Sequence, residues 1–336
     1  MRRLVDDARL AYRWAVSVVR FATEAAPAPF SASFAVTDRC NLECGYCSCP
    51  YADHTELPLA DVARLLARFR EMGVARLGLV GGEPMLRRDL SDVIALAKAH
   101  GFVVCVNTNL TLYGRFPERL AGADLVFTSL DGDAAAHRAN RGARAYDGVL
   151  DAIRTLVAAG TPVVAICVVT ERNLDQADGL LAQAEALGIR VHFQPVCTGG
   201  PAPAGCAPDV PNEAFRAFFR RLLAHKRAGR PVASSRGYLA HMAAWEDFRT
   251  TALHDPTTRC AAGRAFLYVD PRGGAFPCPY TRTTTPVDLL ATRWEEAWSG
   301  ETPCTRCNVG PMVEFNLLVR HPLGAALDVW RSYARR

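Results

Sequence analysis

Short apolar runs alternate with amphipathic stretches between residues 32 and 196 of the 336-residue chain. The apolar runs have the length and the β-branched content of buried strands, and the stretches between them repeat apolar residues at helical spacing. Because helices connect successive strands, we expect the strands to lie parallel and to wind in one direction. The predicted strands span 32–37, 76–82, 102–108, 124–131, 162–170 and 190–196, and the predicted helices lie near 59–72, 90–99, 115–121, 146–159 and 175–187.

This pattern divides the chain into an α/β core and flanking segments. The core, residues 31–196, is expected to form an open sheet or a partial (β/α)6 barrel, with its ligand site at the carboxyl ends of the strands. Residues 1–30 contain a predicted amphipathic helix. After the core we expect a linker and helical segment at 197–257, a small cysteine-containing domain at 258–310 and a C-terminal helix at 311–336.

Both ends of the chain combine apolar and basic residues. The first predicted helix carries Trp14 and Phe21 among arginines, and residues 313–336 end in a similar pattern. Such helices either pack on a domain or lie on a membrane surface, so peripheral membrane contact stays open. No apolar run reaches membrane-spanning length and no signal peptide is present, so we expect a cytoplasmic protein, with membrane association as the alternative.

Charge and cysteine content narrow the function classes. The 39 basic and 34 acidic residues give a net charge of +5, too small for a polybasic nucleic-acid binder, so no nucleic-acid partner is expected. Twelve cysteines without an export signal favour metal binding or catalysis over disulfides. Cys105 and Cys167 lie inside apolar strand runs and are expected to be buried small hydrophobic residues.

Three cysteines follow the first predicted strand in the stretch CNLECGYC, at Cys40, Cys44 and Cys47. A closed zinc site usually takes four ligands, often from paired CxxC units. Three thiolates instead suit a cubane [4Fe–4S] cluster, with one iron left open to an exchangeable ligand. Cys49 is an alternative ligand. The loop therefore predicts an open iron–sulfur cluster.

A second cysteine set lies near the C-terminus, at Cys260, Cys278, Cys304 and Cys307. The segment between the first two reads as a tight hairpin with its turn at residues 270–274, which would bring these two cysteines together. Four thiolates fill a cubane, so a closed cluster for electron transfer or structure is expected. A structural zinc is the alternative.

These motifs resemble the radical S-adenosylmethionine (SAM) superfamily, whose signature is CxxxCxΦC with Φ aromatic, here Tyr46. One family position differs, because Leu110 stands where the family has glycine. Further matches at successive strand ends are GGEP at Gly81–Pro84, VNTN at Val106–Asn109, SLDG at Ser129–Gly132, HRANRG at His137–Gly142 and QPV at Gln194–Val196.

The resemblance implies an enzyme whose open iron chelates the amino and carboxylate groups of SAM. An electron from the reduced cluster then cleaves SAM to methionine and a 5′-deoxyadenosyl radical, which abstracts hydrogen from the substrate. Glu83 is expected to pair with the ammonium group, and Ser129 and Asp131 with ribose hydroxyls. The expected cofactor-binding residues are Tyr46, Gly81, Gly82, Glu83, Pro84, Asn107, Ser129, Asp131, Arg141 and Gln194.

The C-terminal cysteines resemble the opening element of SPASM domains, which bind auxiliary [4Fe–4S] clusters. Val313 stands where a full SPASM domain would have a later cysteine, so the set matches the shortened twitch version with one cluster. An auxiliary cluster suits the uptake of an electron from a substrate radical. A reductant such as flavodoxin or ferredoxin is the implied protein partner.

The substrate is not specified by these motifs. Only 39 residues precede Cys40, so we expect no fused leader-peptide-binding domain, and we favour a small-molecule or lipid biosynthetic substrate over peptide maturation. Oxidation, epimerisation and C–C bond formation stay open. Cys197 and Cys206 are candidate hydrogen donors, with free loop thiols as the alternative. An iron–sulfur or zinc protein without SAM chemistry is the alternative of another class.

Overall fold

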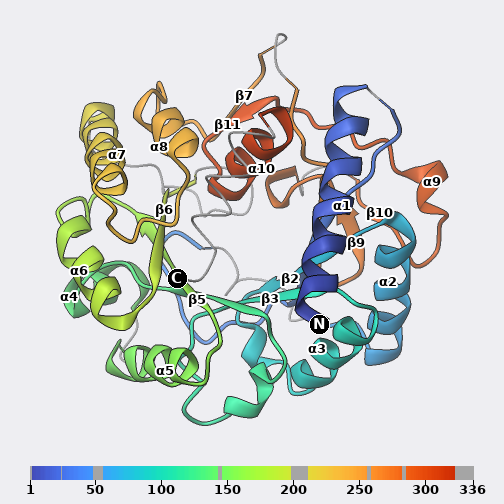
Figure 1. Cartoon of the computed structure of the whole chain (residues 1–336), viewed down its shortest axis with the longest axis horizontal. Coiled ribbons are helices and arrows are strands. Elements are labelled where there is room, and N and C mark those ends of the chain that lie inside the picture. Colours follow the sequence, from blue (N-terminus) through green and yellow to red (C-terminus); the bar gives the residue numbers. More distant parts are fainter. Residues whose placement is uncertain are drawn as a thin grey trace.

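Parallel strands form the centre of the protein and helices surround them, as the computed structural model shows (Figure 1). The structure describes residues 2–23, 25–47, 56–142, 146–197, 211–255, 259–281 and 285–321. The helices are α1 (Arg2–Ala22), α2 (Leu59–Met72), α3 (Leu90–Ala99), α4 (Ala134–Arg141), α5 (Tyr146–Ala158), α6 (Ala177–Leu187), α7 (Asn212–Arg227), α8 (Arg236–Ala243), α9 (Trp294–Ala297) and α10 (Gly310–Arg320). The strands are β1 (Ser31–Thr37), β2 (Arg76–Gly81), β3 (Val103–Thr108), β4 (Leu125–Ser129), β5 (Val163–Val169), β6 (Arg190–Pro195), β7 (Ala252–Leu253), β8 (Phe266–Val269), β9 (Gly274–Phe276), β10 (Val287–Asp288) and β11 (Arg306–Cys307).

Strands β1 to β6 pair in parallel and in chain order, which confirms the expected α/β fold with a partial barrel. The predicted strands and the larger predicted helices agree with the observed elements to within about two residues. The expected helix at 115–121 is wrong in type, because the chain forms only a 3₁₀ turn at Pro117–Leu120. Helices α4 and α8 were not predicted, since both are short and cover fewer than three turns.

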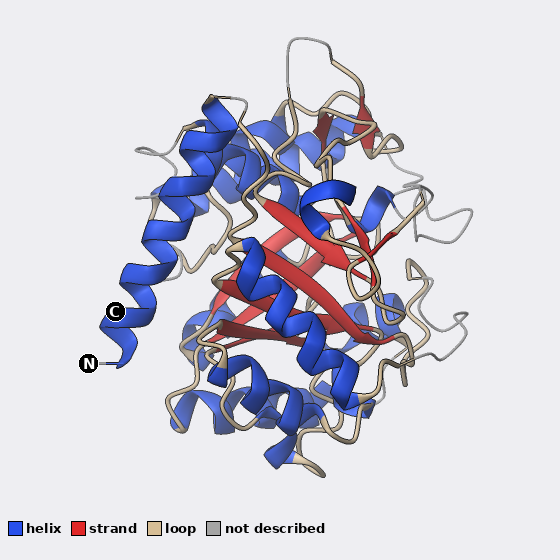
Figure 2. Cartoon of the chain, turned by 90° about the vertical axis from the view of Figure 1, so that its right-hand side faces the viewer, coloured by secondary structure: helices blue, strands red, loops and turns tan. Residues whose placement is uncertain are grey.

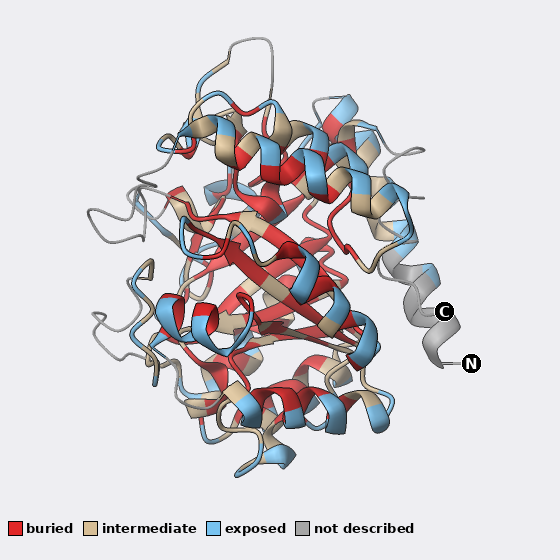
Figure 3. Cartoon of the chain, turned by 90° about the vertical axis from the view of Figure 1, so that its left-hand side faces the viewer, coloured by how far each residue is buried: buried red, intermediate tan, exposed pale blue. Residues whose placement is uncertain are grey.

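Side chains alternate between the two faces of the strands. Leu77 and Leu79 of β2 and Val106 of β3 are fully buried in the core shared with the outer helices. Asn107 of β3 and Ser129 of β4 each follow a buried residue of their own strand, so they lie on the opposite face, and both are partly exposed. Figure 2 shows the helices packed around the strands, and Figure 3 shows that much of the strand backbone belongs to buried residues. The polar side chains of Asn107 and Ser129 therefore lie on the face of the strands opposite the apolar side chains that pack against the helices.

The C-terminal hairpin joins the central sheet. Strands β8 and β9 pair antiparallel, as predicted, and Asp270 N–H donates to the carbonyl of Gly274 across the turn, at 2.9 Å. Strand β8 then runs parallel to β1, with Ser31 beside Phe266. The sheet order is therefore β10-β9-β8-β1-β2-β3-β4-β5-β6. The division of the chain at residue 258 stays a prediction, because the hairpin and the core share one sheet.

Helix α10 lies between the two edges of the six-stranded unit (Figure 1). At one end Gly310 packs so closely on β6 that a Cβ would lie 2.8 Å from Nε2 of His192. Further along, the ring of Phe315 lies 5.5 Å from that of Phe30 and 5.2 Å from that of Phe266, measured between centroids. Helix α10 therefore connects β6 with the β1 and β8 side of the sheet.

Helix α1 packs against α10 through an apolar cluster that contains Phe21 and Val319. Tyr12 and Val19 lie on its exposed face, with 64% and 59% of their surface accessible. Packing against α10 thus explains some of the apolar residues of α1, and membrane contact stays a prediction. Within the described ranges, no helix combines the length and apolar character needed to cross a bilayer.

Candidate active site

The GGEP turn after β2 contacts the backbone that leads into the cysteine loop. Gly82 N–H donates to the carbonyl of Thr37 at 2.9 Å, and Glu83 N–H donates to that of Arg39 at 2.7 Å. A Cβ on Gly81 would lie 2.1 Å from the Thr37 oxygen, and a Cβ on Gly82 would lie 2.2 Å from the Arg39 oxygen. Both glycines are therefore needed for this backbone contact, which fixes where the cysteine loop begins.

Glu83 is buried and its carboxylate joins the ends of β2 and β3. Its Oε1 accepts from Thr108 Oγ1 at 2.6 Å and from Met85 N at 3.0 Å, and its Oε2 accepts from Asn109 N at 2.7 Å. Burial raises the pKa of Glu83, while these hydrogen bonds lower it. The expected contact with the SAM ammonium group stays a prediction, and the structure adds a role in positioning the two strand ends.

The cysteine loop brings three thiols together beyond the end of β1. Cys47 N–H donates to the carbonyl of Cys44 at 3.0 Å, which closes a turn between these two residues. The pKa of Cys44 is raised to about 11, chiefly by burial, with Arg141 lowering it and nearby Cys47 and Cys40 adding to the rise. The three side chains are thus close enough to affect one another's charge, as ligands of one cluster must be.

Asp131 holds the cysteine loop to the barrel. It is fully buried, and its Oδ2 accepts from Arg141 Nε at 2.7 Å and from the Tyr46 hydroxyl at 3.1 Å. Its Oδ1 accepts from Val168 N at 2.9 Å. The guanidinium of Arg141 also lies 5.5 Å from the centre of the Tyr46 ring. Contact of Asp131 with ribose stays a prediction, and its observed partners join β4, β5, α4 and the loop.

Helix α4 carries most of the HRANRG motif, and its residues make contacts that the sequence analysis did not predict. The carbonyl of Asn140 accepts from Gly45 N in the cysteine loop at 3.3 Å, and its Oδ1 accepts from Thr170 Oγ1 at 2.9 Å. Among the described residues Asn140 Nδ2 has no partner, so a buried donor remains beside the loop. Burial, followed by Arg141, lowers the pKa of His137 to about 4, so its ring is neutral and accepts from Asp131 N at 3.4 Å.

The C-terminal cysteines converge from the hairpin and the segment before α10. Nearby N–H groups donate to the Cys260 sulfur, from Ala262 at 3.4 Å and from the Asn316 side chain at 3.5 Å, as is common around iron–sulfur clusters. The described residues contain no three side chains arranged around a single metal ion, whereas cubane ligands bind separate irons. Each cysteine of the set is buried or half-buried and affects the charge of another: Cys260, Cys278, Cys304 and Cys307.

Cys197 follows β6 and lies beside the C-terminal cysteines. Burial raises the pKa of its thiol to about 11, and it shares a hydrogen bond with the Tyr280 hydroxyl. Its Sγ also lies 3.9 Å from Oδ1 of Asn308 and close enough to Cys278 to affect that residue's charge. Its role as a hydrogen donor stays a prediction, and the other candidate, Cys206, lies outside the described residues.

The remaining predicted residues occupy the strand ends. Asn107 and Gln194 are partly exposed near the ends of β3 and β6, as Ser129 is at the end of β4. Pro84 is buried and begins the 3₁₀ turn that follows Glu83. Cys105 and Cys167 are buried in strands, as expected. Cys49 lies outside the described residues.

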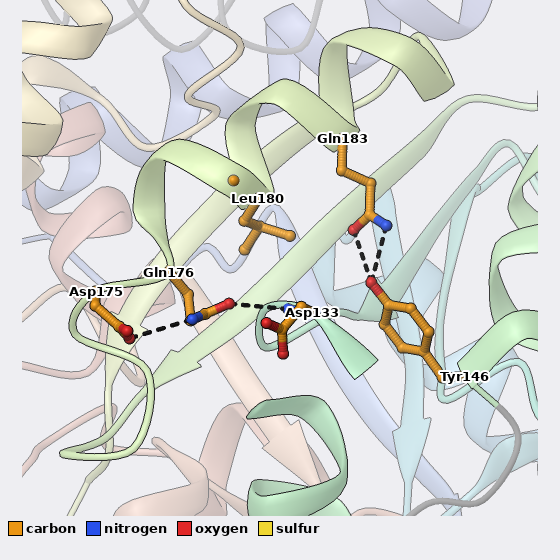
Figure 4. Close-up of a pocket in the computed structure, with 7 residues that line it drawn as sticks. Asp133, Tyr146, Asp175, Gln176, Leu180 and Gln183 are labelled. Carbon is orange, nitrogen blue, oxygen red and sulfur yellow. Dashed lines mark hydrogen bonds between the residues drawn. The ribbon is translucent and has the colours of Figure 1, made fainter. Parts of the chain in front are cut away.

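A pocket lies on the outer side of the β4–α4 loop, next to α6 (Figure 4). Gln183 Nε2 donates to the Tyr146 hydroxyl oxygen at 2.8 Å, and Asp133 N–H donates to Gln176 Oε1 at 3.1 Å. None of the predicted site residues lines this pocket. Gln176 and Tyr146 of this pocket bond to Asp133 and Gly132, and so they support the loop that carries Asp131.

Comparison with known proteins identifies similar chains. The profile of the Radical SAM superfamily matches residues 34–184. A PqqA peptide cyclase from Streptomyces rochei is 32% identical, with 82% of this chain and 77% of the relative covered. Mycofactocin maturase MftC from Mycobacterium ulcerans is 27% identical, with 75% and 69% covered. The structure of Streptococcus suis SuiB bound to S-adenosylmethionine has a TM-score of 0.66 at 17% identity, with 82% of this chain and 66% of SuiB covered.

The expectation of a small-molecule or lipid substrate is wrong. The relative at 32% identity is named a peptide cyclase, and SuiB has also been solved bound to the precursor peptide SuiA. That expectation rested on the 39 residues before Cys40 and on the apolar-basic terminal helices, and neither feature determines which substrate the site binds. The alternative class, peptide maturation, agrees better with these findings.

Proposed function

Since the chain belongs to the radical SAM superfamily, we propose that it modifies a precursor peptide by radical chemistry. The observation that carries this proposal is the 32% identity to a PqqA peptide cyclase, which extends over 288 residues and covers 82% of this chain. The resemblance seen in the sequence is confirmed at the level of the family, and the protein is an enzyme that binds a [4Fe–4S] cluster and SAM.

We assign the first cluster to Cys40, Cys44 and Cys47. A reduced cluster held by these cysteines would supply the electron for the reductive cleavage of SAM, and so the radical chemistry proposed for the peptide. The chain's own groups prepare the site. Buried Arg141 places a positive charge beside Cys44, which favours the thiolate that a cluster requires. Tyr46 is held by its hydrogen bond to Asp131, so the loop keeps its position on the barrel.

We assign an auxiliary [4Fe–4S] cluster to the C-terminal cysteines, in a twitch-like region at about 258–310. The N–H groups of Ala262 and Asn316 that donate to the Cys260 sulfur would stabilise negative charge on it. Four protein ligands leave no open iron, which suits electron uptake from the substrate. A flavodoxin or ferredoxin is proposed as the external reductant.

The test separates peptide from other substrates. The reconstituted enzyme, with dithionite and SAM, is given peptide, small-molecule and lipid fractions of an extract from the source cells, and 5′-deoxyadenosine is measured. We expect stimulation by the peptide fraction, lost when that fraction is first digested with a protease. The Cys44→Ala variant should form no 5′-deoxyadenosine with any fraction.

The opposite pattern would overturn the proposal. Stimulation that resides in the lipid or small-molecule fraction and survives protease treatment would show that the substrate is not a peptide. Mass spectrometry of the stimulating peptide before and after reaction then gives the outcome. A loss of two hydrogens indicates oxidation or cross-linking. An unchanged mass after reaction in H2O, together with uptake of a deuterium after reaction in D2O, indicates epimerisation.

A further inference from the structure

The residue after Cys40 belongs to a closed ring of side-chain hydrogen bonds. Asn109 Nδ2 donates to Asn41 Oδ1 at 2.9 Å, and Asn41 Nδ2 donates to Thr111 Oγ1 at 2.8 Å. The Thr111 hydroxyl then donates to Asn109 Oδ1 at 2.7 Å. Because each side chain both donates and accepts, the ring fixes the orientation of all three groups.

The same ring is tied to the GGEP turn through the backbone of Asn109. Asn109 N–H donates to Glu83 Oε2 at 2.7 Å, and Glu83 N–H donates to the carbonyl of Arg39 at 2.7 Å. The residues on both sides of Cys40 are therefore held in place by hydrogen bonds. Arg39 is bonded to Glu83, and Asn41 is bonded to Asn109, which is itself bonded to Glu83.

Leu110 gives the turn between Asn109 and Thr111 its shape. Its φ of 59° is the one positive value at a non-glycine position in the part of the chain that the structure describes. Its side chain is 1% exposed in the core and its N–H donates to Thr108 Oγ1 at 3.0 Å. Burial of this side chain offsets the backbone strain. Leucine can therefore occupy the position at which the radical SAM family usually has glycine.

We propose that Asn41, Asn109 and Thr111 form a positioning clasp that sets the spacing between Cys40 and the GGEP turn. This inference rests on the proposed placement of SAM between the first cluster and that turn. A ligand held at two points requires a fixed distance between them. Loss of the clasp should therefore weaken SAM binding before it releases iron, because the three thiols remain in the loop.

The test removes one hydroxyl from the clasp. Thr111→Val keeps the side-chain shape but removes the hydroxyl that Asn41 and Asn109 share, whereas Thr111→Ser retains it. For the reconstituted full chain, we measure iron per chain and the SAM concentration that half-completes the change in the EPR spectrum of the dithionite-reduced enzyme. We expect Thr111→Val to keep its iron and to need about tenfold more SAM, as the loss of one to two hydrogen bonds predicts. Thr111→Ser should restore the response.

Two further variants control for general effects. Asn41→Asp keeps the acceptor for Asn109 but loses the donor to Thr111, so it should reproduce the weakened SAM response. Thr155→Val removes a hydroxyl that donates to the Asp151 carbonyl at 2.9 Å on the exposed face of α5, and it should leave the response unchanged.

Two results would overturn the clasp. One is an unchanged SAM response in Thr111→Val. The other is loss of iron with an unchanged half-saturating SAM concentration in the remaining enzyme, which would make the ring a support of the cluster alone. These readouts need no substrate, so they are independent of whether the substrate is a peptide.

Discussion

Asp131 shows how a motif residue acts through partners that the sequence does not name. Its two oxygens accept from a backbone amide, a guanidinium and a phenol that come from β5, α4 and the cysteine loop. Burial disfavours the charge of Arg141, but Asp131 and other neighbours raise its pKa, so Arg141 keeps its charge. A buried ion pair of this kind fixes one arrangement of the loop, because either partner alone would be an uncompensated charge.

Asp131→Asn should therefore destabilise the protein strongly. Arg141 is 7% exposed and would lose its counter-charge, which typically costs about 3–5 kcal/mol of unfolding free energy. Urea denaturation of the iron-free chain measures this. Asp151→Asn is the control, because its ion pair with Arg154 is exposed and should contribute less than about 1 kcal/mol. Equal losses in both variants would contradict the anchoring role of Asp131.

The sequence identified the residue types of the site but not their contacts. The loop of Cys40, Cys44 and Cys47 could be predicted because ligand spacing is local. The hydrogen bonds of Glu83 to β3 could not, since they depend on which strands become neighbours. Asn140 lies in the recognised HRANRG motif, but its role was not predicted for a related reason, because its carbonyl and its side chain contact segments far apart in the chain.

At the scale of elements, local periodicity predicted the strands well and their long-range pairing less well. Short apolar runs between amphipathic stretches located β1 to β6, and the turn predicted at residues 270–274 located the β8–β9 hairpin. The parallel pairing of β8 with β1 joins residues 31 and 266, and no local pattern contains that information. It places the second cysteine set against the core sheet.

The contact between the β2 turn and the cysteine loop yields an element-scale prediction. Gly82→Ala would place a Cβ 2.2 Å from the Arg39 carbonyl oxygen, so the two backbones must separate. We expect a loss of about 1–3 kcal/mol in unfolding free energy, measured by chemical denaturation, together with weaker iron retention by the first cluster.

Gly114→Ala is the matched control for this substitution. Nothing lies within 4 Å of the position that its Cβ would occupy, so stability and iron content should stay close to those of the parent protein. If both variants showed the same unfolding free energy and iron content, the close backbone approach at Gly82 would not contribute to stability.

At the scale of the whole molecule, helix α10 connects the two edges of the barrel unit and the two ends of the chain. Its first residue packs on β6, its middle contacts the β1 and β8 side, and its last turn packs with α1. Asn316 of the same helix donates to the Cys260 sulfur. The C-terminal cysteine set is thus in contact with the helix that joins these edges.

Two separate cysteine sets imply that iron can be removed from one and kept in the other. Replacing Cys40, Cys44 and Cys47 by alanine should lower the iron content from about eight to about four per chain and abolish SAM cleavage. The C-terminal set should keep its iron, because its ligands lie in a different part of the sheet. Cys105→Ala is the control and should retain about eight, since Cys105 is buried in β3 away from both sets. Retention of eight irons by the triple variant would remove the loop from the cluster assignment.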